Sequence, residues 1–218
     1  MPTIRPGVLT VATYAAFAPV CSSDEQGVQG RDVDFLRAFA QTQGLALDFR
    51  VFLFDRIWER PGHNEVDLAA AGIAPLPERQ TPGVLWSEPY FTVERSLLIR
   101  ATDQAKFKTI ADFAGYTIAA TQGSTADIDT LERKPAAAKL VYYDMQERAV
   151  VELLSGKIDA FGTGDVCSRY LIDQYPGQLA LADVHPMAEP ENFAFAVRAA
   201  SGLLDALNAF IRENRVRY

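Results

Sequence analysis

The alternation of apolar runs with capped helical segments predicts an α/β protein. A β-branched apolar run at 8–14 predicts a buried strand. A helix is predicted at 30–44, where Asp32 can cap the amino end and Gly44 can supply the left-handed stop. A second apolar run at 45–53 predicts another strand, so the chain opens as βαβ.

The same alternation continues through the rest of the chain. Residues 54–60 are predicted to be helical and 66–72 to form a third strand. The remaining strands are expected at 96–100, 116–121, 139–143, 158–164 and 193–199, and the remaining helices at 109–115, 126–133, 147–154 and 203–214. Two βαβαβ series therefore follow one another, similar in architecture and not in sequence.

Two series of this kind predict two α/β lobes. The first lobe is expected to comprise 1–99 together with 192–218, and the second to comprise 100–191. Open parallel sheets bind ligands outside the carboxyl ends of their strands. We therefore expect a ligand cleft between the lobes, with hinges near 98–101 and 189–193.

Composition excludes several classes of function. The 218 residues are 49% hydrophobic and carry a formal net charge of -7, with no basic run that would neutralise a nucleic-acid backbone. No apolar stretch approaches the roughly 20 residues that a membrane-spanning helix requires. Cys21 and Cys167 form no CxxC pair and lie far from His63 and His185 in sequence. We expect ordinary unpaired thiols, no metal and no cofactor.

A possible anion site lies between a predicted strand and a predicted helix. The backbone N–H groups and hydroxyls of Gly123, Ser124 and Thr125 would meet the positive end of that helix. The alternative is a plain turn in which Ser or Thr caps the helix.

A basic, an acidic and two aromatic residues at the ends of predicted strands are further candidates for ligand binding. Arg79 could pair with a carboxylate, or be a surface arginine. Asp165 could meet an ammonium group, or cap a helix. Tyr14 and Phe54 could wall a pocket, or belong to the core. Their shared position at strand ends favours one binding site.

The order of the segments resembles the type II periplasmic solute-binding proteins of polar amino acid transport, over almost the whole chain. The segments that carry the resemblance are VLTVATYAAF, GRDVDFLRAFAQTQG, FDRIWERPGHNEVDLAAAG, LPERQTPGVLWSEPYF, TQGST and SGKIDAFGTGD. The resemblance implies a two-lobed fold in which each lobe is a βαβ-based sheet flanked by helices, and two hinge strands join the lobes.

The resemblance also implies roles for individual residues. The ligand carboxylate is expected to meet Arg79, Ser124 and Thr125, with Gly72 and Ala74 in the same binding loop. The ligand ammonium is expected to meet Asp165, and the ligand side chain to lie against Tyr14 and Phe54.

Three positions depart from the family pattern. Ala74 lacks a hydroxyl that the family usually offers to the carboxylate, and Leu76 replaces another polar residue. Val11 stands at a position where members with basic ligands often carry Asp. A neutral or apolar amino acid, or a simpler carboxylate, is therefore the expected ligand.

The expected function is capture of that ligand outside the cytoplasm and its delivery to an ABC transporter permease, by a monomer without catalytic residues. The signal peptide is expected to have been removed. One alternative is a ligand-sensing module of a larger receptor or cell-wall protein. Another is a cyclohexadienyl dehydratase of the same fold, for which Glu88 and Asp55 are the candidate acids.

Overall fold

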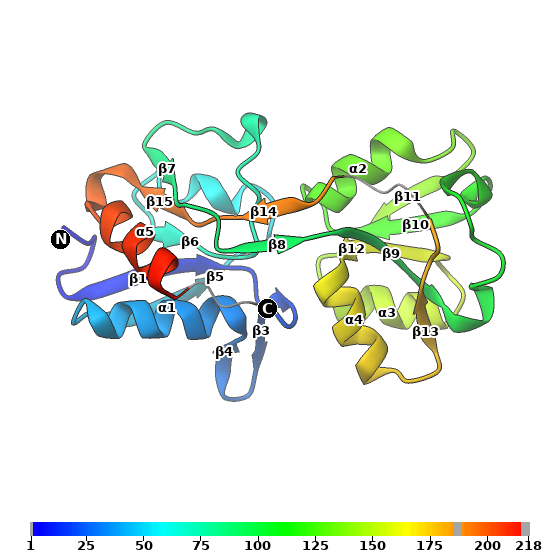
Figure 1. Ribbon diagram of the computed structural model, residues 1–218, viewed down its shortest axis with the longest axis horizontal. Helices are drawn as coiled ribbons and strands as arrows, with labels where there is room; N and C mark the ends of the chain where they lie inside the picture. The colour runs from blue at the N-terminus through cyan, green and yellow to red at the C-terminus, as the bar shows by residue number, and fades with distance from the viewer. Residues whose placement is uncertain (1, 185–188, 215–218) are drawn as a thin grey trace. The chain divides into compact units, whose positions relative to one another are not determined.

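The computed structural model describes residues 2–184 and 189–214, and the chain divides into two compact units (Figure 1). Unit 1 comprises Met1–Thr92 and Glu191–Tyr218, and unit 2 comprises Val93–Pro190. The sequence pattern predicted residues 93–99 in the first lobe. The strand that begins at Arg95 instead belongs to the sheet of unit 2, because it pairs with two strands of that unit.

The elements follow one another in the predicted alternating order. The strands are β1 (Val8–Thr13), β2 (Ala16–Phe17), β3 (Cys21–Asp24), β4 (Gly27–Gln29), β5 (Ala46–Val51), β6 (Leu68–Ala69), β7 (Val84–Trp86), β8 (Phe91–Val93), β9 (Arg95–Arg100), β10 (Thr117–Ala120), β11 (Lys139–Tyr142), β12 (Ala160–Gly164), β13 (Leu179–Leu181), β14 (Glu191–Phe193) and β15 (Ala196–Arg198). The α-helices are α1 (Arg31–Thr42), α2 (Thr125–Arg133), α3 (Gln146–Leu154), α4 (Asp165–Gln174) and α5 (Leu204–Glu213). Short 3₁₀ turns lie at Ile57–Glu59, Pro77–Arg79, Ala101–Asp103, Ile110–Phe113 and Ala199–Ser201.

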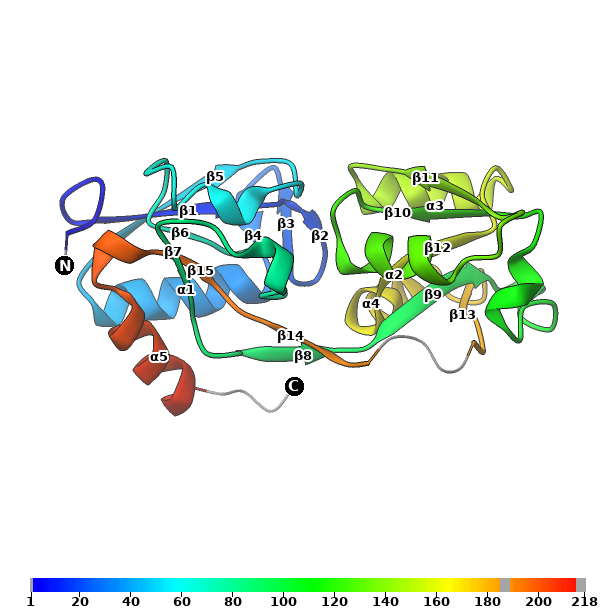
Figure 2. The same cartoon turned by 90° about the horizontal axis from the view of Figure 1, so that it is seen from above.

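The main sheet of unit 1 has the strand order β5-β1-β6-β15-β7. Strands β5, β1 and β6 are parallel, and β15 pairs antiparallel with β6 and β7. Helices α1 and α5 lie on the same side of this sheet (Figure 2). Their apolar faces join the strands in one core formed by Leu9, Val11, Leu36, Phe39, Ala40, Leu68, Ala70, Phe195, Val197, Leu203, Leu207 and Ile211.

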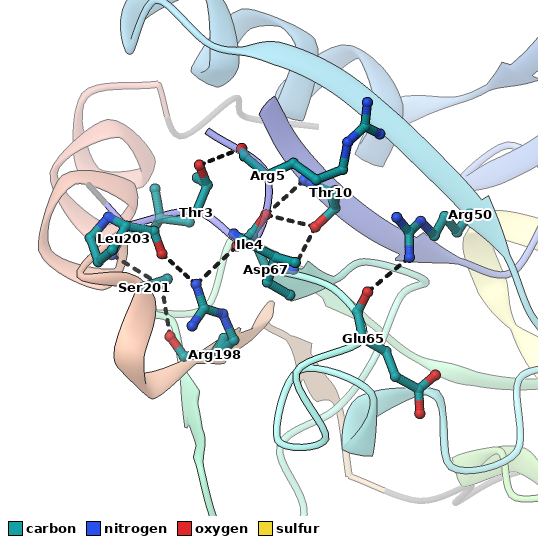
Figure 3. Close-up of polar contacts among 11 residues, drawn as sticks. Thr3, Ile4, Arg5, Thr10, Arg50, Glu65, Asp67, Arg198, Ser201 and Leu203 are labelled. Carbon is teal, nitrogen blue, oxygen red and sulfur yellow. Dashed lines mark hydrogen bonds and ion pairs between the residues drawn. The ribbon is translucent and has the colours of Figure 1, made fainter. Parts of the chain in front are cut away.

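A buried carboxylate ties the amino-terminal segment to this sheet (Figure 3). Asp67 Oδ1 accepts a hydrogen bond from the N–H of Ile4 at 2.8 Å and lies 3.2 Å from Arg198 Nη2. Its Oδ2 accepts from the N–H of Thr10 at 2.9 Å and from the Thr10 hydroxyl at 2.6 Å. Because a buried charge is tolerated only when paired and hydrogen-bonded, this network fixes β1, β6 and β15 at the amino end of β1.

The sheet of unit 2 repeats the plan with the order β11-β10-β12-β9-β13. Strands β11, β10 and β12 are parallel, whereas β9 pairs antiparallel with β12 and β13. Helix α2 lies on one face of this sheet, and α3 and α4 lie on the other (Figure 1). The predicted binding residues Gly123, Ser124 and Thr125 follow the carboxyl end of β10, and Asp165 follows the carboxyl end of β12.

Several predicted elements differ from the structure. Asp32 does not cap α1, because Gly30 is the N-cap and the Asp32 side chain is buried. The predicted helix at 54–60 is only a 3₁₀ turn, and the third predicted strand is reduced to Leu68–Ala69. The β2-β3-β4 meander and helix α4 were not predicted. No helix within the described part of the chain combines the length and apolarity needed to cross a membrane.

Candidate functional site

Arg79 is the central charged group of the candidate site in unit 1. It ends the 3₁₀ turn Pro77–Arg79, which Pro77 starts because its fixed φ suits the first helical position. The side chain is only 2% exposed, and Nη1 donates a hydrogen bond to the carbonyl oxygen of Ala74 at 2.9 Å. Arg79 is therefore not the surface arginine that was the alternative interpretation.

Two aromatic rings lie beside this guanidinium, and a third ring contacts one of them. The central carbon of the guanidinium lies 4.5 Å from the centroid of Trp58 and 5.8 Å from that of Phe54. Phe54 in turn makes edge contacts with Tyr14, at 5.7 Å between centroids, and with Trp58, at 6.1 Å. The structure thus places Phe54 and Trp58 beside Arg79, and Tyr14 beside Phe54. Trp58 was not among the residues predicted from the sequence.

Burial changes the charge properties of Arg79 without removing the charge. Loss of hydration lowers its pKa to about 10, and the nearby Glu78 opposes part of this decrease. The guanidinium therefore stays protonated at neutral pH in an apolar surrounding. A cation in such a place interacts strongly with an anion that reaches it.

The buried carboxyl group of Asp32 binds the start of the loop that leads to Arg79. Gly72 adopts a φ of 60°, and its N–H donates to Asp32 Oδ2 at 3.1 Å. Asp32 Oδ1 accepts from the Tyr90 hydroxyl at 2.7 Å. Burial raises the pKa of Asp32 to about 7, although both hydrogen bonds act in the opposite direction. The Gly72 N–H expected to serve the ligand is thus already bound to Asp32, and the Ala74 carbonyl is bound to Arg79.

Val11 lies in the core between the sheet and α1, with no exposed surface. Its side chain packs in the same core as Leu36 and Phe39. That a valine at this position disfavours a basic ligand stays a prediction. Tyr14 directly follows β1, and its ring contacts the ring of Phe54.

In unit 2, the predicted anion turn is a capped helix start. Ser124 is the N-cap of α2, and its Oγ accepts a hydrogen bond from the N–H of Asp127 at 3.1 Å. The Asp127 carboxylate accepts from the N–H of Gly123 at 3.0 Å. Ser124 therefore has the capping role that was the alternative, but its hydroxyl hydrogen remains a possible donor to a ligand. Thr125 follows as the first residue of α2.

Asp165 is the first residue of α4, directly after the carboxyl end of β12. Its Oδ1 accepts from the N–H of Glu94 at 3.0 Å, and its Oδ2 lies 3.5 Å from Arg169 Nε. The N-cap is Gly164, so the Asp165 carboxylate does not cap the helix. The side chain is 27% exposed, which leaves it accessible to an ammonium group.

The remaining candidate residues have other partners or surroundings. Glu88 forms an ion pair with Arg212 of α5, and Asp55 is exposed. Cys21 and Cys167 are buried cysteines, and Cys21 Sγ donates to the carbonyl oxygen of Tyr14. His185 lies outside the described residues. No cluster of three or more His, Cys, Asp or Glu side chains suited to a metal occurs among the residues that the structure describes.

The fold, with two mixed sheets flanked by helices and binding candidates at strand ends, defines a two-lobed periplasmic-binding-protein fold of type II. Residues 9–216 match the family of bacterial extracellular solute-binding proteins, family 3. The chain belongs to this family.

Individual relatives agree with this assignment. The chain is 28% identical over 203 residues to the ABC transporter arginine-binding protein 1 of Escherichia coli K12, covering 90% of this chain and 79% of the relative. The arginine-bound form of truncated ArgBP from T. maritima is 28% identical, with a TM-score of 0.84 over 95% of this chain and 96% of the other. The ancestral amino acid-binding protein AncCDT-1, a precursor of cyclohexadienyl dehydratase, is 26% identical with a TM-score of 0.85, covering 95% and 89%.

Proposed function

We propose that this protein binds one free amino acid outside the cytoplasm and delivers it to an ABC transporter permease. Unit 1 would contribute Arg79 for the ligand carboxylate and Tyr14 and Phe54 for the ligand side chain. Unit 2 would contribute Ser124 and Thr125 for the carboxylate and Asp165 for the ammonium group. Closure of the two lobes would capture the ligand, and reopening would release it.

The observation that carries the proposal is the burial of the Arg79 charge among aromatic rings. Removing a guanidinium from water is costly unless a partner compensates it. The contacts of Arg79 with the Ala74 carbonyl and the Trp58 ring hold the side chain in place. Glu78 already acts on this charge, and a ligand carboxylate would add to its compensation. The planar guanidinium suits two parallel hydrogen bonds to such a carboxylate.

Family membership and the names of the relatives support an amino acid as the ligand. One similar protein is named for arginine, and an ancestral arginine-binding protein with 27% identity is described as bound to glutamine. The shared feature of these ligands is the α-amino acid group. For this chain we propose a free amino acid as the ligand class from that shared group.

The test mixes ligand-stripped protein with each member of a panel of amino acids and simple carboxylates. Thermal unfolding detects binding as a gain in stability, and calorimetry measures the Kd. A ligand at about 100 times its Kd should add roughly 2.7 kcal/mol of stability. We expect Arg79→Ala to lower the affinity by at least about 30-fold, since breaking a buried charge pair costs about 2–5 kcal/mol. Arg79→Lys should also bind weakly, because an ammonium cannot form the paired hydrogen bonds of a guanidinium.

Arg37→Ala is the matched control, because Arg37 is a solvent-exposed arginine of the same unit that pairs with Asp34 on the surface. It should bind like the original protein. Circular dichroism would establish that each variant is folded. Absence of binding by any amino acid to the unmodified protein, or equal binding by folded Arg79→Ala, would overturn the proposal.

A dehydratase is the second candidate, because one similar structure is described as a precursor of cyclohexadienyl dehydratase. Such a reaction needs a general acid placed at the leaving hydroxyl of the substrate. The two acids considered for it are Glu88, which is paired with Arg212, and the exposed Asp55. These positions favour binding without catalysis, and incubation with prephenate would test for turnover directly.

A further inference from the structure

Trp58 is the aromatic residue whose ring lies nearer to the Arg79 guanidinium. The distance from the central guanidinium carbon to the ring centroid is 4.5 Å for Trp58, against 5.8 Å for Phe54. Only 7% of Trp58 is exposed. Tryptophan offers a cation the most favourable aromatic face, and the attraction grows when water is excluded. Trp58 therefore contacts the charge of Arg79 in a place where this contact is effective.

Two short 3₁₀ turns carry the two side chains. Trp58 is the middle residue of the turn Ile57–Glu59, and Arg79 is the last residue of the turn Pro77–Arg79. Ile57, which precedes Trp58, is fully buried, and its N–H donates to the carbonyl oxygen of Phe54 at 3.1 Å. The backbone that carries the Trp58 ring is thus fixed in unit 1.

The segments that follow these turns pack backbone against backbone. A Cβ atom on Gly62 would lie 2.6 Å from the carbonyl oxygen of Pro82, and one on Gly83 would lie 3.4 Å from the Cα atom of Gly62. A side chain at Gly62 would therefore push the segments apart. Gly62 closely follows Trp58 in the chain, and Pro82 closely follows Arg79. The approach of Trp58 to Arg79 is therefore built into the packing of unit 1.

Two contacts of the Arg79 guanidinium restrict its orientation. Nη1 donates to the carbonyl oxygen of Ala74 at 2.9 Å, and the central carbon lies over the Trp58 ring. Ala74 and Trp58 are both buried, so neither contact is exposed to competition from bulk water. A planar guanidinium binds a carboxylate through paired hydrogen bonds in one orientation. Fixing that orientation before the ligand arrives lowers the entropy lost on binding.

We propose that Trp58 is a positioning residue, which acts through Arg79 to raise the affinity of the protein for the carboxylate of its ligand. The inference rests on the proposed amino-acid function and deepens it. Trp58 holds the guanidinium in the orientation that receives the carboxylate, and its contribution to affinity therefore depends on the presence of Arg79.

The test is a double-mutant cycle on ligand affinity. Calorimetry with each of the common amino acids identifies the one that binds the unmodified protein most tightly. Its Kd is then measured for Trp58→Leu, Arg79→Ala and the double variant. We expect Trp58→Leu to raise the Kd about tenfold when Arg79 is present and about twofold or less when Arg79 is replaced by alanine. A purely structural role of Trp58 would raise the Kd by the same factor in both backgrounds.

A conservative variant provides a second, independent result. Trp58→Phe should keep the Kd within about threefold of the original value, because phenylalanine retains an aromatic face for the cation. Circular dichroism would establish that each variant is folded. Trp58→Met, whose side chain is long and flexible, replaces Trp58→Leu in the cycle if the leucine variant does not fold.

Trp86→Leu is the matched control, because Trp86 is the other tryptophan of the chain and lies in β7 of the same unit, opposite Ala196 of β15. It should leave the Kd unchanged. An unchanged Kd in folded Trp58→Leu, an equal factor in both backgrounds, or the same loss in Trp58→Phe as in Trp58→Leu would overturn the role of Trp58 while leaving the amino-acid function intact. If no amino acid binds the unmodified protein, the proposed function fails, and this inference fails with it.

Discussion

The two units use the same sheet plan but build their candidate binding groups in different ways. In unit 1, Arg79 is held by groups distant in sequence, including the ring of Trp58, and the loop before it is anchored by Asp32. In unit 2, Ser124 is positioned by its place at the start of α2, whereas Asp165 combines a place at the start of α4 with a hydrogen bond from the N–H of Glu94, 71 residues away in sequence. Unit 1 therefore depends more on tertiary packing, and unit 2 depends more on local helix geometry. This difference predicts that equivalent changes will have larger effects in unit 1.

The largest expected difference concerns two glycines with positive φ. A Cβ on Gly72 would lie 2.8 Å from Phe17 Cε1 and 2.9 Å from Phe193 Cε2, both closer than normal packing allows. Gly156, which follows α3 in unit 2, has a φ of 79° and nothing within 4 Å of such a Cβ. Gly72→Ala should therefore cost about 3 kcal/mol or more, from overpacking together with backbone strain, and Gly156→Ala only about 1 kcal/mol.

Denaturant unfolding of both variants would measure these costs. Gly72→Ala should also weaken ligand binding, because the glycine begins the loop that leads to Arg79. Equal destabilisation by the two substitutions would contradict the view that unit 1 depends more strongly on packing.

The next effect is a pH dependence of stability caused by Asp32. Its pKa is about 7 in the folded protein, against an ordinary value of 3.8, so the folded state holds the proton more tightly than the unfolded state. The stability from this proton is complete below about pH 4 and is lost as the pH rises through about 7. From pH 5 to pH 8, the original protein should lose on the order of 2–3 kcal/mol relative to Asp32→Asn.

The comparison requires unfolding curves of both proteins at several pH values, since taking their difference cancels the contributions of other groups. Asp34→Asn is a suitable control, because Asp34 lies in the same helical turn but is exposed on the surface. It should show a flat difference over this range. A flat difference for Asp32→Asn would mean that the buried acid is ionised throughout.

The contrast between local and long-range contacts also explains which parts of the fold and the candidate site could be predicted from the sequence. Helix α2 and its Ser124 start were predictable, because a serine three residues before an acid is a local capping signal. The β-branched runs likewise predicted β1 and β10, and no end of either strand was misplaced by more than one residue. Asp32 was predicted as a cap because its real partners, Gly72 and Tyr90, are 40 and 58 residues away. Trp58 gave no local signal either, since only the tertiary fold brings it to Arg79.

The smallest effect separates helix capping from ligand binding at Ser124. Ser124→Ala removes the acceptor for the N–H of Asp127, and loss of such a cap costs about 1 kcal/mol. Ser155→Ala removes an exposed hydrogen bond at the end of α3 and should cost less than about 0.5 kcal/mol. If Ser124 also donates to the ligand carboxylate, its substitution should weaken binding, whereas Ser155→Ala should not. Thermal unfolding without ligand gives the capping cost, and calorimetry with ligand gives the binding cost. Loss of stability with unchanged affinity would restrict Ser124 to the helix and leave the carboxylate to Arg79 and Thr125.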